Sequence, residues 1–339
     1  MPPERRASQT PGVQASKLAG DLFELGGAGP LIVDLAQGVG GAAAPGGQVR
    51  IGVDLAGELP ATDADSFDIL FTARRDPPAP WVCVASGEVG ATIADLHAAI
   101  ERQPVAAAVA AQVMRMTLKL GFDDALALES LGYSMLLASE GFRAWRAANP
   151  PRARAADDAA RVSVDVAAGA IEIRLARPAR RNAFDAAMRD ALAEALTFAL
   201  DHPDAPPVVV SGEGPAFSAG GDLDEFGQAA DVGWAHLVRT LRSPARLAQA
   251  LGGRLTARLH GACVGAGIEV PAAAARVTAR PDAVFRLPEV SMGLIPGAGG
   301  TATIPRRIGR HRAAWMAVSG AAIDATTALA WGLIDEIRP

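Results

Sequence analysis

The chain of 339 residues contains little cysteine, little lysine and few aromatic residues. Its two cysteines, Cys83 and Cys263, lie far apart without the spacing of a zinc or redox motif, which argues against a disulfide scaffold and favours a reducing compartment. Its basic residues are nearly all arginine, and the net charge is −5. This balance gives no general affinity for nucleic acid or for an anionic membrane surface. An anionic ligand would need a local basic site.

Long apolar runs are also missing. No segment reaches membrane-spanning length, and the opening MPPERRASQTPGVQ lacks the apolar centre of a signal peptide. We therefore expect a cytoplasmic protein without a membrane partner, in which residues 1–12 form a mobile tail. Half of the residues are hydrophobic, which is enough for two compact domains.

The first half changes character near residue 90. Before it, short β-type runs alternate with turn-rich pieces; the runs are LIVDL, VRIGVDL, FDILFT and WVCVAS. After it come long segments rich in alanine and leucine, which predict helices. In the last segment Leu128, Leu131, Met135, Phe142 and Trp145 recur at helical spacing, which is more typical of core or subunit contact than of a cofactor site. Residues 13–147 are thus predicted to be an α/β domain with a helical end.

Proline, arginine and paired aspartates replace this periodicity over residues 148–162, which predicts a linker. A second domain, residues 163–339, opens with VSVDVAAGAIEIRL, the pattern of a hairpin. Asn182 is predicted to cap the helix that follows. The order strand, helix, strand then repeats, which indicates an α/β layer architecture.

Two glycine-rich turns occur in this second half, PAFSAGGDLDEF at residues 215–226 and HGACVGAGIEVP at residues 260–271. Each stands where a strand gives way to a helix, a place that exposes backbone N–H groups. Glycines there often serve only close packing, and neither turn has the spacing of a dinucleotide fingerprint. Two such turns facing one another could hold an oxyanion.

A carboxylate among apolar neighbours follows the second turn, Glu269, and another lies in LPEVSMGLIPGAGG, Glu289. Burial without a partner would raise their pKa values and suit acid–base work beside a polarised carbonyl. The alternative is that each glutamate caps a helix or pairs with Arg286, Arg306 or Arg307. Histidines add no clear signal. We expect His260 to be a packing or turn residue and His311, in RRIGRHRAAW, to lie in an exposed basic stretch.

Four separated motifs resemble the crotonase superfamily, the enoyl-CoA hydratases and isomerases, in the family's order. They are RPARRNAF, AFSAGGDL, HGACVGAGIEV and LPEVSMGLIPGAGGT, within residues 162–337. The later SGAAIDATTALAWGLIDEI is also similar to the family. The resemblance implies an α/β fold, a crotonase-like spiral of ββα units, here preceded by the smaller α/β domain with its long helices.

The resemblance also implies roles. Gly221 and Ala266 would donate their N–H groups to the thioester oxygen. Glu269 would activate water for addition at Cβ of a trans-2-enoyl-CoA, and Glu289 would protonate Cα, with the two roles reversible or shared. Hydratases of the family typically keep both glutamates, so a lyase of the hydratase type is favoured. The open alternatives are an isomerase or another enolate-forming enzyme of this fold, and a non-catalytic CoA-binding or scaffold subunit.

Binding of the CoA part is likewise implied by the resemblance. The residues at the matching positions are Arg180, Arg181, Ala183, Ala219 and Asp222; the last is also expected to fix its own turn. No metal or organic cofactor is implied, because coenzyme A belongs to the substrate. The family pattern further implies a homo-oligomer, a trimer or hexamer, and a place in fatty acid metabolism.

The chain departs from the family at both ends. It stops after GLIDEIRP, where family members continue for several helices, and it has the additional first half. Within that half, ESLGYSMLLASEGFRAWRAANPP, residues 129–151, is similar to the tail of ordinary crotonases. We therefore hypothesise that the first half is a shrunken, diverged crotonase-like unit whose helices, from about Ala91 to Ala148, pack where those last helices belong, in the same or a neighbouring subunit.

Overall fold

The structure is a computed structural model that describes residues 29–37, 47–84, 88–152 and 159–339. The predicted tail, residues 1–12, lies outside these ranges, as does the middle of the predicted linker. Within these described ranges, no helix is long and apolar enough to cross a membrane. The domain boundaries remain predictions, since the elements on the two sides of the linker pack against each other, as described below.

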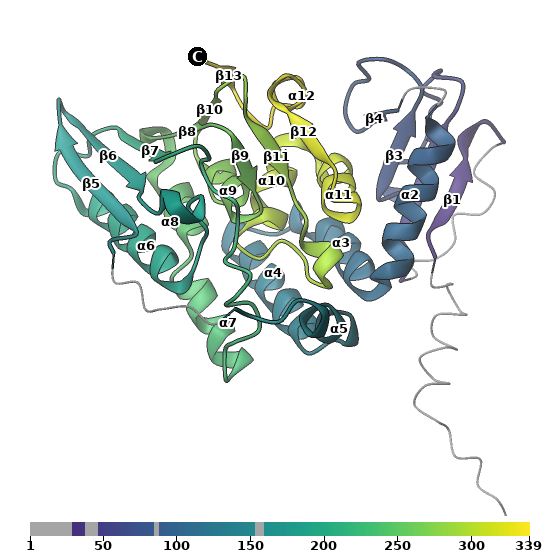
Figure 1. Cartoon of the computed structure of the whole chain (residues 1–339). Helices are drawn as coiled ribbons and strands as arrows, with labels where there is room; N and C mark the ends of the chain where they lie inside the picture. The colour runs from purple at the N-terminus through teal and green to yellow at the C-terminus, as the bar shows by residue number, and fades with distance from the viewer. Residues whose placement is uncertain (1–28, 38–46, 85–87, 153–158) are drawn as a thin grey trace, which may run out of the picture.

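The first half contains a small parallel sheet with strand order β1-β2-β3-β4. The strands are β1 (Leu31–Asp34), β2 (Arg50–Asp54), β3 (Ile69–Thr72) and β4 (Val82–Cys83), with one-turn helices η1 (Leu35–Gln37) and η2 (Ala64–Ser66). All four lie where the β-type runs predicted strands. Strands β2 and β3 are buried over most of their length, which explains why their sequences are nearly continuous apolar runs. Figure 1 shows this sheet with a helix on one face.

Helices make up the rest of the first half. They are α2 (Val89–Arg102), α3 (Pro104–Thr117), α4 (Phe122–Leu137) and α5 (Glu140–Ala148). The proline at the first position of α3 suits a helix start. The last predicted helical segment is divided in two, because the Ser139 side chain accepts a hydrogen bond from the Phe142 N–H and so begins α5.

The second half opens with the predicted hairpin. Strands β5 (Val162–Ala167) and β6 (Ala170–Leu175) pair antiparallel around Ala168 and Gly169, both with positive φ, as a tight two-residue turn requires. The hairpin ends a six-stranded sheet with the order β13-β10-β8-β7-β6-β5. The other strands of this sheet are β7 (Val208–Gly212), β8 (Leu255–Leu259), β10 (Arg276–Ala279) and β13 (Glu336–Ile337).

A second, three-stranded sheet has the order β12-β11-β9. Its strands are β9 (Ala262–Val264), β11 (Val284–Arg286) and β12 (Ala322–Asp324). The α-helices of the second half are α6 (Ala186–Asp201), α7 (Val232–Leu241), α8 (Pro244–Leu251), α9 (Ala266–Glu269), α10 (Gly300–Ile308), α11 (Arg310–Ser319) and α12 (Ala325–Trp331). Its one-turn helices are η3 (Pro178–Arg180), η4 (Gly252–Arg254), η5 (Pro271–Ala273) and η6 (Glu289–Met292).

One correction concerns the start of α6. Its cap is Asp185, whose carboxylate accepts from the Met188 N–H, and not Asn182 as predicted. Asn182 is instead fully buried and donates to the backbone carbonyls of Glu213, Ala216 and Phe217. It ties the turn after β6 to the chain segment after β7, a long-range role that a local capping pattern does not reveal.

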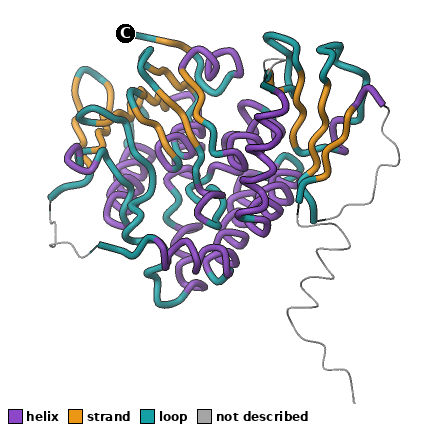
Figure 2. The backbone as a smooth tube through the Cα atoms, turned by 45° about the vertical axis from the view of Figure 1, so that its right-hand side comes forward, coloured by secondary structure: helices purple, strands orange, loops and turns teal. Residues whose placement is uncertain are grey.

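The helices of the first half pack on the second half of the same chain. Helix α3 lies against α10 and α11, and α4 lies against α7 and α10. One hydrophobic core therefore runs through both halves, from Val49 beside the first sheet to Ile334 near the last strand. Figures 1 and 2 show α3 and α4 among the helices beneath the larger sheet. The two halves are thus in contact within one chain, and the replacement of the family's last helices by α2 to α5 stays a hypothesis.

A second correction concerns RRIGRHRAAW. The side chains of Arg310, His311 and Arg312 are buried, with exposed fractions of 7%, 6% and 4%, and not exposed as predicted. They face the first sheet. Arg310 Nη1 donates to the Phe67 carbonyl at 2.8 Å, and Arg312 Nε donates to the Trp81 carbonyl at 3.0 Å.

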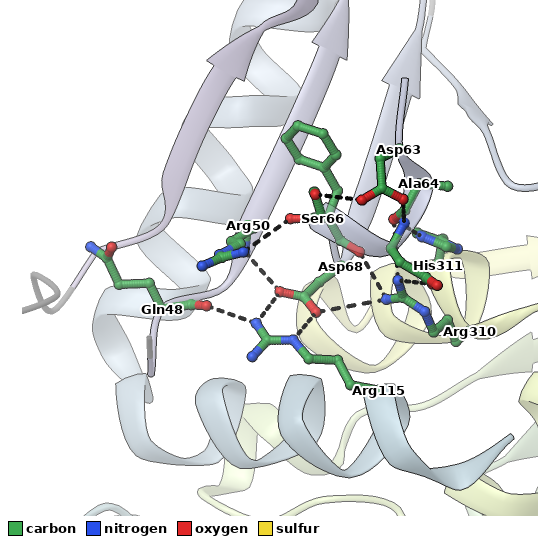
Figure 3. A network of polar contacts seen from close by, with 11 residues as sticks. Gln48, Arg50, Asp63, Ala64, Ser66, Asp68, Arg115, Arg310 and His311 are labelled. Carbon is green, nitrogen blue, oxygen red and sulfur yellow. Dashed lines mark hydrogen bonds and ion pairs between the residues drawn. The ribbon is translucent and has the colours of Figure 1, made fainter. Parts of the chain in front are cut away.

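A carboxylate from the first sheet joins this contact (Figure 3). Asp68, between η2 and β3, is 1% exposed and accepts both Nε and Nη2 of Arg115 from α3, at 2.7 and 2.6 Å. Such paired hydrogen bonds fix geometry as well as charge. The first sheet is therefore attached to the helices α3 and α11 by polar contacts as well as by the shared core.

Candidate active site

The first glycine-rich turn is held in an extended pairing with the segment before α6. The Phe184 N–H donates to the Gly220 carbonyl at 2.8 Å, and the Asp222 N–H donates to the Phe184 carbonyl at 2.8 Å. Between them, the Gly221 N–H donates to no group of the described residues. Asp222 is buried, and its Oδ1 accepts the Asp224 N–H at 3.3 Å, a backbone bond of the kind predicted to fix this turn. Its Oδ2 also accepts a charge-assisted bond from Arg177 Nη1 at 3.0 Å.

The second turn lies directly against the first. The Val264 N–H donates to the Ser218 carbonyl at 3.0 Å, and a Cβ on Gly267 would meet that same carbonyl oxygen at 2.6 Å. Glycine is therefore required for the close approach. Gly265 has φ of 49° and precedes α9, whose first residue, Ala266, has an N–H that donates to no described group. The two predicted donors thus belong to two turns in contact.

Two buried carboxylates lie beside the second turn. Glu269, at the end of α9, is 2% exposed, and Glu289, at the start of η6, is 7% exposed. Glu289 Oε1 occupies the space where a Cβ on Gly265 would stand, and Glu269 Oε1 lies 3.6 Å from the same point. The two predicted acids therefore face one another across Gly265.

A third buried carboxylate comes from the first half of the chain and was missed in the sequence. Glu129 of α4 is 2% exposed. Its Oε1 accepts the Gly299 N–H at 2.7 Å, and its Oε2 accepts the N–H and the hydroxyl of Thr301, both at 2.7 Å. In the sequence, Glu129 directly follows Leu128 of the apolar stripe, and only its charge among apolar neighbours was a signal.

Glu129 and Glu269 share the N-terminal end of α10. Glu269 Oε2 accepts the N–H groups of Ala298 and Gly300 at 2.7 and 2.9 Å. Glu129 accepts the N–H groups of Gly299 and Thr301, which alternate with them. A helix N-terminus presents free N–H groups and a positive dipole end, which suit a carboxylate. One glutamate from each half is therefore bound to the same short segment.

The environment changes the acidity of all three groups. Burial raises the pKa of Glu269 to about 7, although the backbone N–H groups of Ala298 and Gly300 oppose the shift. Burial, with the neighbouring charge of Glu269, raises the pKa of Glu129 to about 8. Burial and the same neighbour raise the pKa of Glu289 well above its ordinary value, and its Oε2 accepts no hydrogen bond from the described residues. Each of the three carboxyl groups therefore keeps its proton to a higher pH than an exposed glutamate does.

These groups line one cavity of about 520 Å³. Gly221, Ala266, Glu269 and Glu289 lie in its wall, and Glu129 and Tyr133 of α4 close it from the first half. The arrangement combines free backbone donors with two nearly buried carboxyl groups. It can stabilise charge on a carbonyl oxygen while protons move at neighbouring carbons.

The residues predicted for CoA are more scattered. Of these residues only Asp222 lines the cavity. Arg180 and Arg181 are exposed in the turn around η3. The Ala219 N–H donates to the Arg181 carbonyl at 2.9 Å, and the Ala183 carbonyl accepts from Arg177 Nη1 at 3.2 Å. Their role in CoA binding stays a prediction.

The alternative partners of the two acids are engaged elsewhere. Arg286 donates to the Gly320 carbonyl, Arg306 to carbonyls of Ala302 and Leu120, and Arg307 to the Ala272 carbonyl. His260 bonds the Gly214 carbonyl at 2.9 Å, which fits the expected turn role. Within the described ranges, no cluster of histidine, cysteine and carboxylate side chains is arranged to hold a metal ion.

Known proteins resemble the second half of the chain. The 2,3-dehydroadipyl-CoA hydratase of Escherichia coli (strain K12) is 35% identical over 170 residues, which are 49% of this chain and 64% of that protein. The mevalonyl-coenzyme A hydratase of Beauveria bassiana (strain ARSEF 2860) is 32% identical over 175 residues, 49% of this chain and 62% of that protein. The chain thus spans less than two thirds of the length of these relatives.

A solved structure and a family model extend the comparison. The crystal structure of enoyl-CoA hydratase from Thermoplasma volcanium GSS1 shares 33% identity and covers 53% of this chain and 72% of its own, with a TM-score of 0.48. The model of the enoyl-CoA hydratase/isomerase family matches residues 165–339, just over half of the chain and the part that holds both glycine turns. With its α/β fold and these matched residues, the chain belongs to the enoyl-CoA hydratase/isomerase family, within the crotonase superfamily.

Proposed function

We propose that the protein is an enoyl-CoA hydratase, a lyase that adds water across the double bond of a trans-2-enoyl-CoA. The observation that carries the proposal is the pair of facing carboxylates, Glu269 and Glu289, next to the two turns that present the N–H groups of Gly221 and Ala266. The relatives named as hydratases support the same chemistry. The reaction uses no cofactor beyond the CoA of the substrate.

The two N–H groups bind the thioester oxygen and stabilise the enolate that forms when water adds at Cβ. Each such donor contributes about 3–4 kcal/mol to the transition state in comparable sites. The cavity restricts water, which strengthens these interactions. Small residues in both turns let the thioester approach the backbone.

The protons move through the two glutamates. Glu269, ionised and held through Oε2 by backbone N–H groups, takes a proton from the attacking water with Oε1. Glu289, kept protonated by burial, delivers a proton to Cα as the enolate collapses. Water supplies the hydroxyl group at Cβ, and the proton that it gives to Glu269 balances the proton that leaves Glu289. The two acids exchange a proton before the next turnover.

The test follows the absorbance of crotonyl-CoA after addition of the purified protein. Wild type removes the absorbance, and Glu269→Gln and Glu289→Gln each lower the rate on the order of 10²–10⁴-fold, as removal of a general acid or base does. Glu194→Gln, an exposed position on α6, is the matched control and keeps the rate.

Product analysis separates the nearest alternative. Incorporation of labelled water into a 3-hydroxyacyl-CoA supports the hydratase, whereas a shifted double bond without incorporation identifies an isomerase. An inert protein that still binds crotonyl-CoA would favour the non-catalytic reading. A homo-oligomeric state, a cytoplasmic location and a place in fatty acid metabolism remain predictions.

A further inference from the structure

Three arginines line the cavity, and two of them have a carboxylate partner. Arg189 and Arg242 both pair with Asp190, at 2.8 and 3.2 Å. Arg239 of α7 differs, because no carboxylate of the described residues lies at ion-pair distance from its guanidinium. A cation that is partly removed from water without a counter-ion is unfavourable, so its retention calls for an explanation.

Neutral groups of α4 hold Arg239 in place. Its Nη1 donates to Ser130 Oγ at 2.7 Å and to Ser134 Oγ at 3.1 Å, and its guanidinium carbon lies 4.5 Å from the centre of the Tyr133 ring. Its Nε and Nη2 donate to no group of the described residues. Burial lowers the pKa of Arg239, which stays charged because the ordinary value is so high.

The position of Arg239 relates it to the proposed chemistry. Tyr133, on which Arg239 stacks, packs against Gly297 so closely that a Cβ there would overlap its ring. Gly297 precedes the segment that binds Glu269. Arg239 therefore lies one aromatic ring away from the catalytic segment, in a wall that also contains Leu126 and Leu137.

The charge of Glu129 favours the charged form of Arg239, but among the described residues the two form no ion pair. Glu129, one residue before Ser130, has both oxygens engaged by Gly299 and Thr301. The serines, the aromatic face and the remaining N–H groups together form a rigid receptor for an oxyanion. Leu126 and Leu137 line the same cavity and offer apolar surface for the methylenes of a short acyl chain.

We propose that Arg239 binds a carboxylate at the far end of the acyl chain, so that the substrate is an enoyl-CoA derived from a dicarboxylic acid. The inference rests on the proposed function for the identity of the ligand. The phosphates of CoA are the other source of an anion. The acyl carboxylate is favoured because Arg239 stacks on Tyr133, which packs against Gly297 next to the segment that binds Glu269, whereas phosphate groups remain largely hydrated.

Binding of unreactive, saturated ligands tests the inference without any turnover. Calorimetry compares adipyl-CoA with hexanoyl-CoA, which have equal chain length and differ in a carboxylate against a methyl group. We expect the preference for adipyl-CoA, measured as the Kd of hexanoyl-CoA divided by the Kd of adipyl-CoA, to be at least about 30-fold larger in wild type than in Arg239→Gln. A loss of this size is typical when one partner of a buried charge pair is truncated. Arg242→Gln, which removes a cavity arginine that already has a partner, leaves this ratio as in wild type.

Two results would overturn the proposal. One is equal affinity of wild type for the two ligands. The other is an equal loss of both in Arg239→Gln, which would assign the guanidinium to the CoA phosphates. If Arg239→Gln does not fold, Arg239→Lys replaces it, because lysine keeps the charge and loses the forked N–H donors of the guanidinium. A preference for adipyl-CoA that is unchanged in Arg239→Lys, together with equal wild-type affinities for the two ligands, counts against the proposal.

The kinetic arm separates this inference from the proposed function. It uses trans-2-hexenoyl-CoA and its analogue with a terminal carboxylate. Hydration of both at equal kcat/KM leaves the function intact and contradicts the role of Arg239. Hydration of neither, with preserved preference for adipyl-CoA in calorimetry, contradicts the function and leaves the anion site intact.

Discussion

Gly265 shows how much the site depends on one residue without a side chain. Its φ of 49° and ψ of −122° suit glycine, and a Cβ would take the space of Glu289 Oε1. The short distance between the two carboxylates therefore follows from the absence of a methyl group. It also couples their titration, so that the first ionisation makes the second more difficult.

The acidity of Glu269 sets the pH dependence of catalysis. Its pKa is raised to about 7, and the proposed base must be ionised to accept a proton from water. We expect kcat/KM for crotonyl-CoA to fall about tenfold per pH unit below about pH 7. The decline in rate at high pH reports the loss of the proton from Glu289. A profile that is flat from pH 5 to pH 8 would rule out a base of this acidity.

At the scale of elements, the contact of α4 with the start of α10 organises the site. Glu129 accepts two backbone N–H groups and one hydroxyl, all buried. The same short segment of α10 binds Glu269 from the other side. A change at Glu129 in α4 is therefore transmitted to the catalytic carboxylate through the backbone at the start of α10.

Glu129→Ala tests this link. Loss of the acceptor leaves buried donors without partners, and we expect the free energy of unfolding to fall by about 3 kcal/mol. Urea unfolding measures the change, and Glu140→Ala at the exposed start of α5 is the control. Hydration by the folded fraction should fall as well, because Glu269 loses its fixed orientation. Unchanged stability and unchanged rate would show that Glu129 is only a filler of the cavity wall.

Elements with a local signal could be predicted from the sequence, and contacts across the chain could not. The hairpin of β5 and β6 and both glycine turns follow from neighbouring residues. Glu129 could not be assigned, since its partners lie 170 and 172 residues away. The prediction that the stretch around His311 is exposed was wrong for the same reason. Three consecutive basic residues suggest an exposed surface, and only the carbonyls near the first sheet make their burial possible.

On the scale of the whole molecule, one core joins both halves and encloses three carboxyl groups. Their pKa values are all raised by burial, which means that the folded protein holds these protons more tightly than the unfolded chain. Stability from this source is fully present below the ordinary pKa of 4.5 and is lost as the pH rises through about 7 and 8.

We therefore expect the folded protein to be more stable at pH 5 than at pH 8.5. His311, whose pKa is lowered by burial, has the opposite effect, and it acts only below its ordinary value of 6.5. Urea unfolding at several pH values measures the slope above pH 6.5, and Glu289→Gln should make it shallower. A stability that rises steadily from pH 6.5 to pH 8.5 would contradict the burial of these acids in protonated form.

The contact between Glu129 and Thr301 also has a consequence for synthesis on the ribosome. The two residues are separated by 172 positions, and translation adds roughly 5–20 residues per second. Helix α4 thus leaves the exit tunnel many seconds before the strand-and-helix segment that covers it has been made. During that interval the Glu129 carboxylate has none of its native partners, and the catalytic pocket closes only near the end of translation.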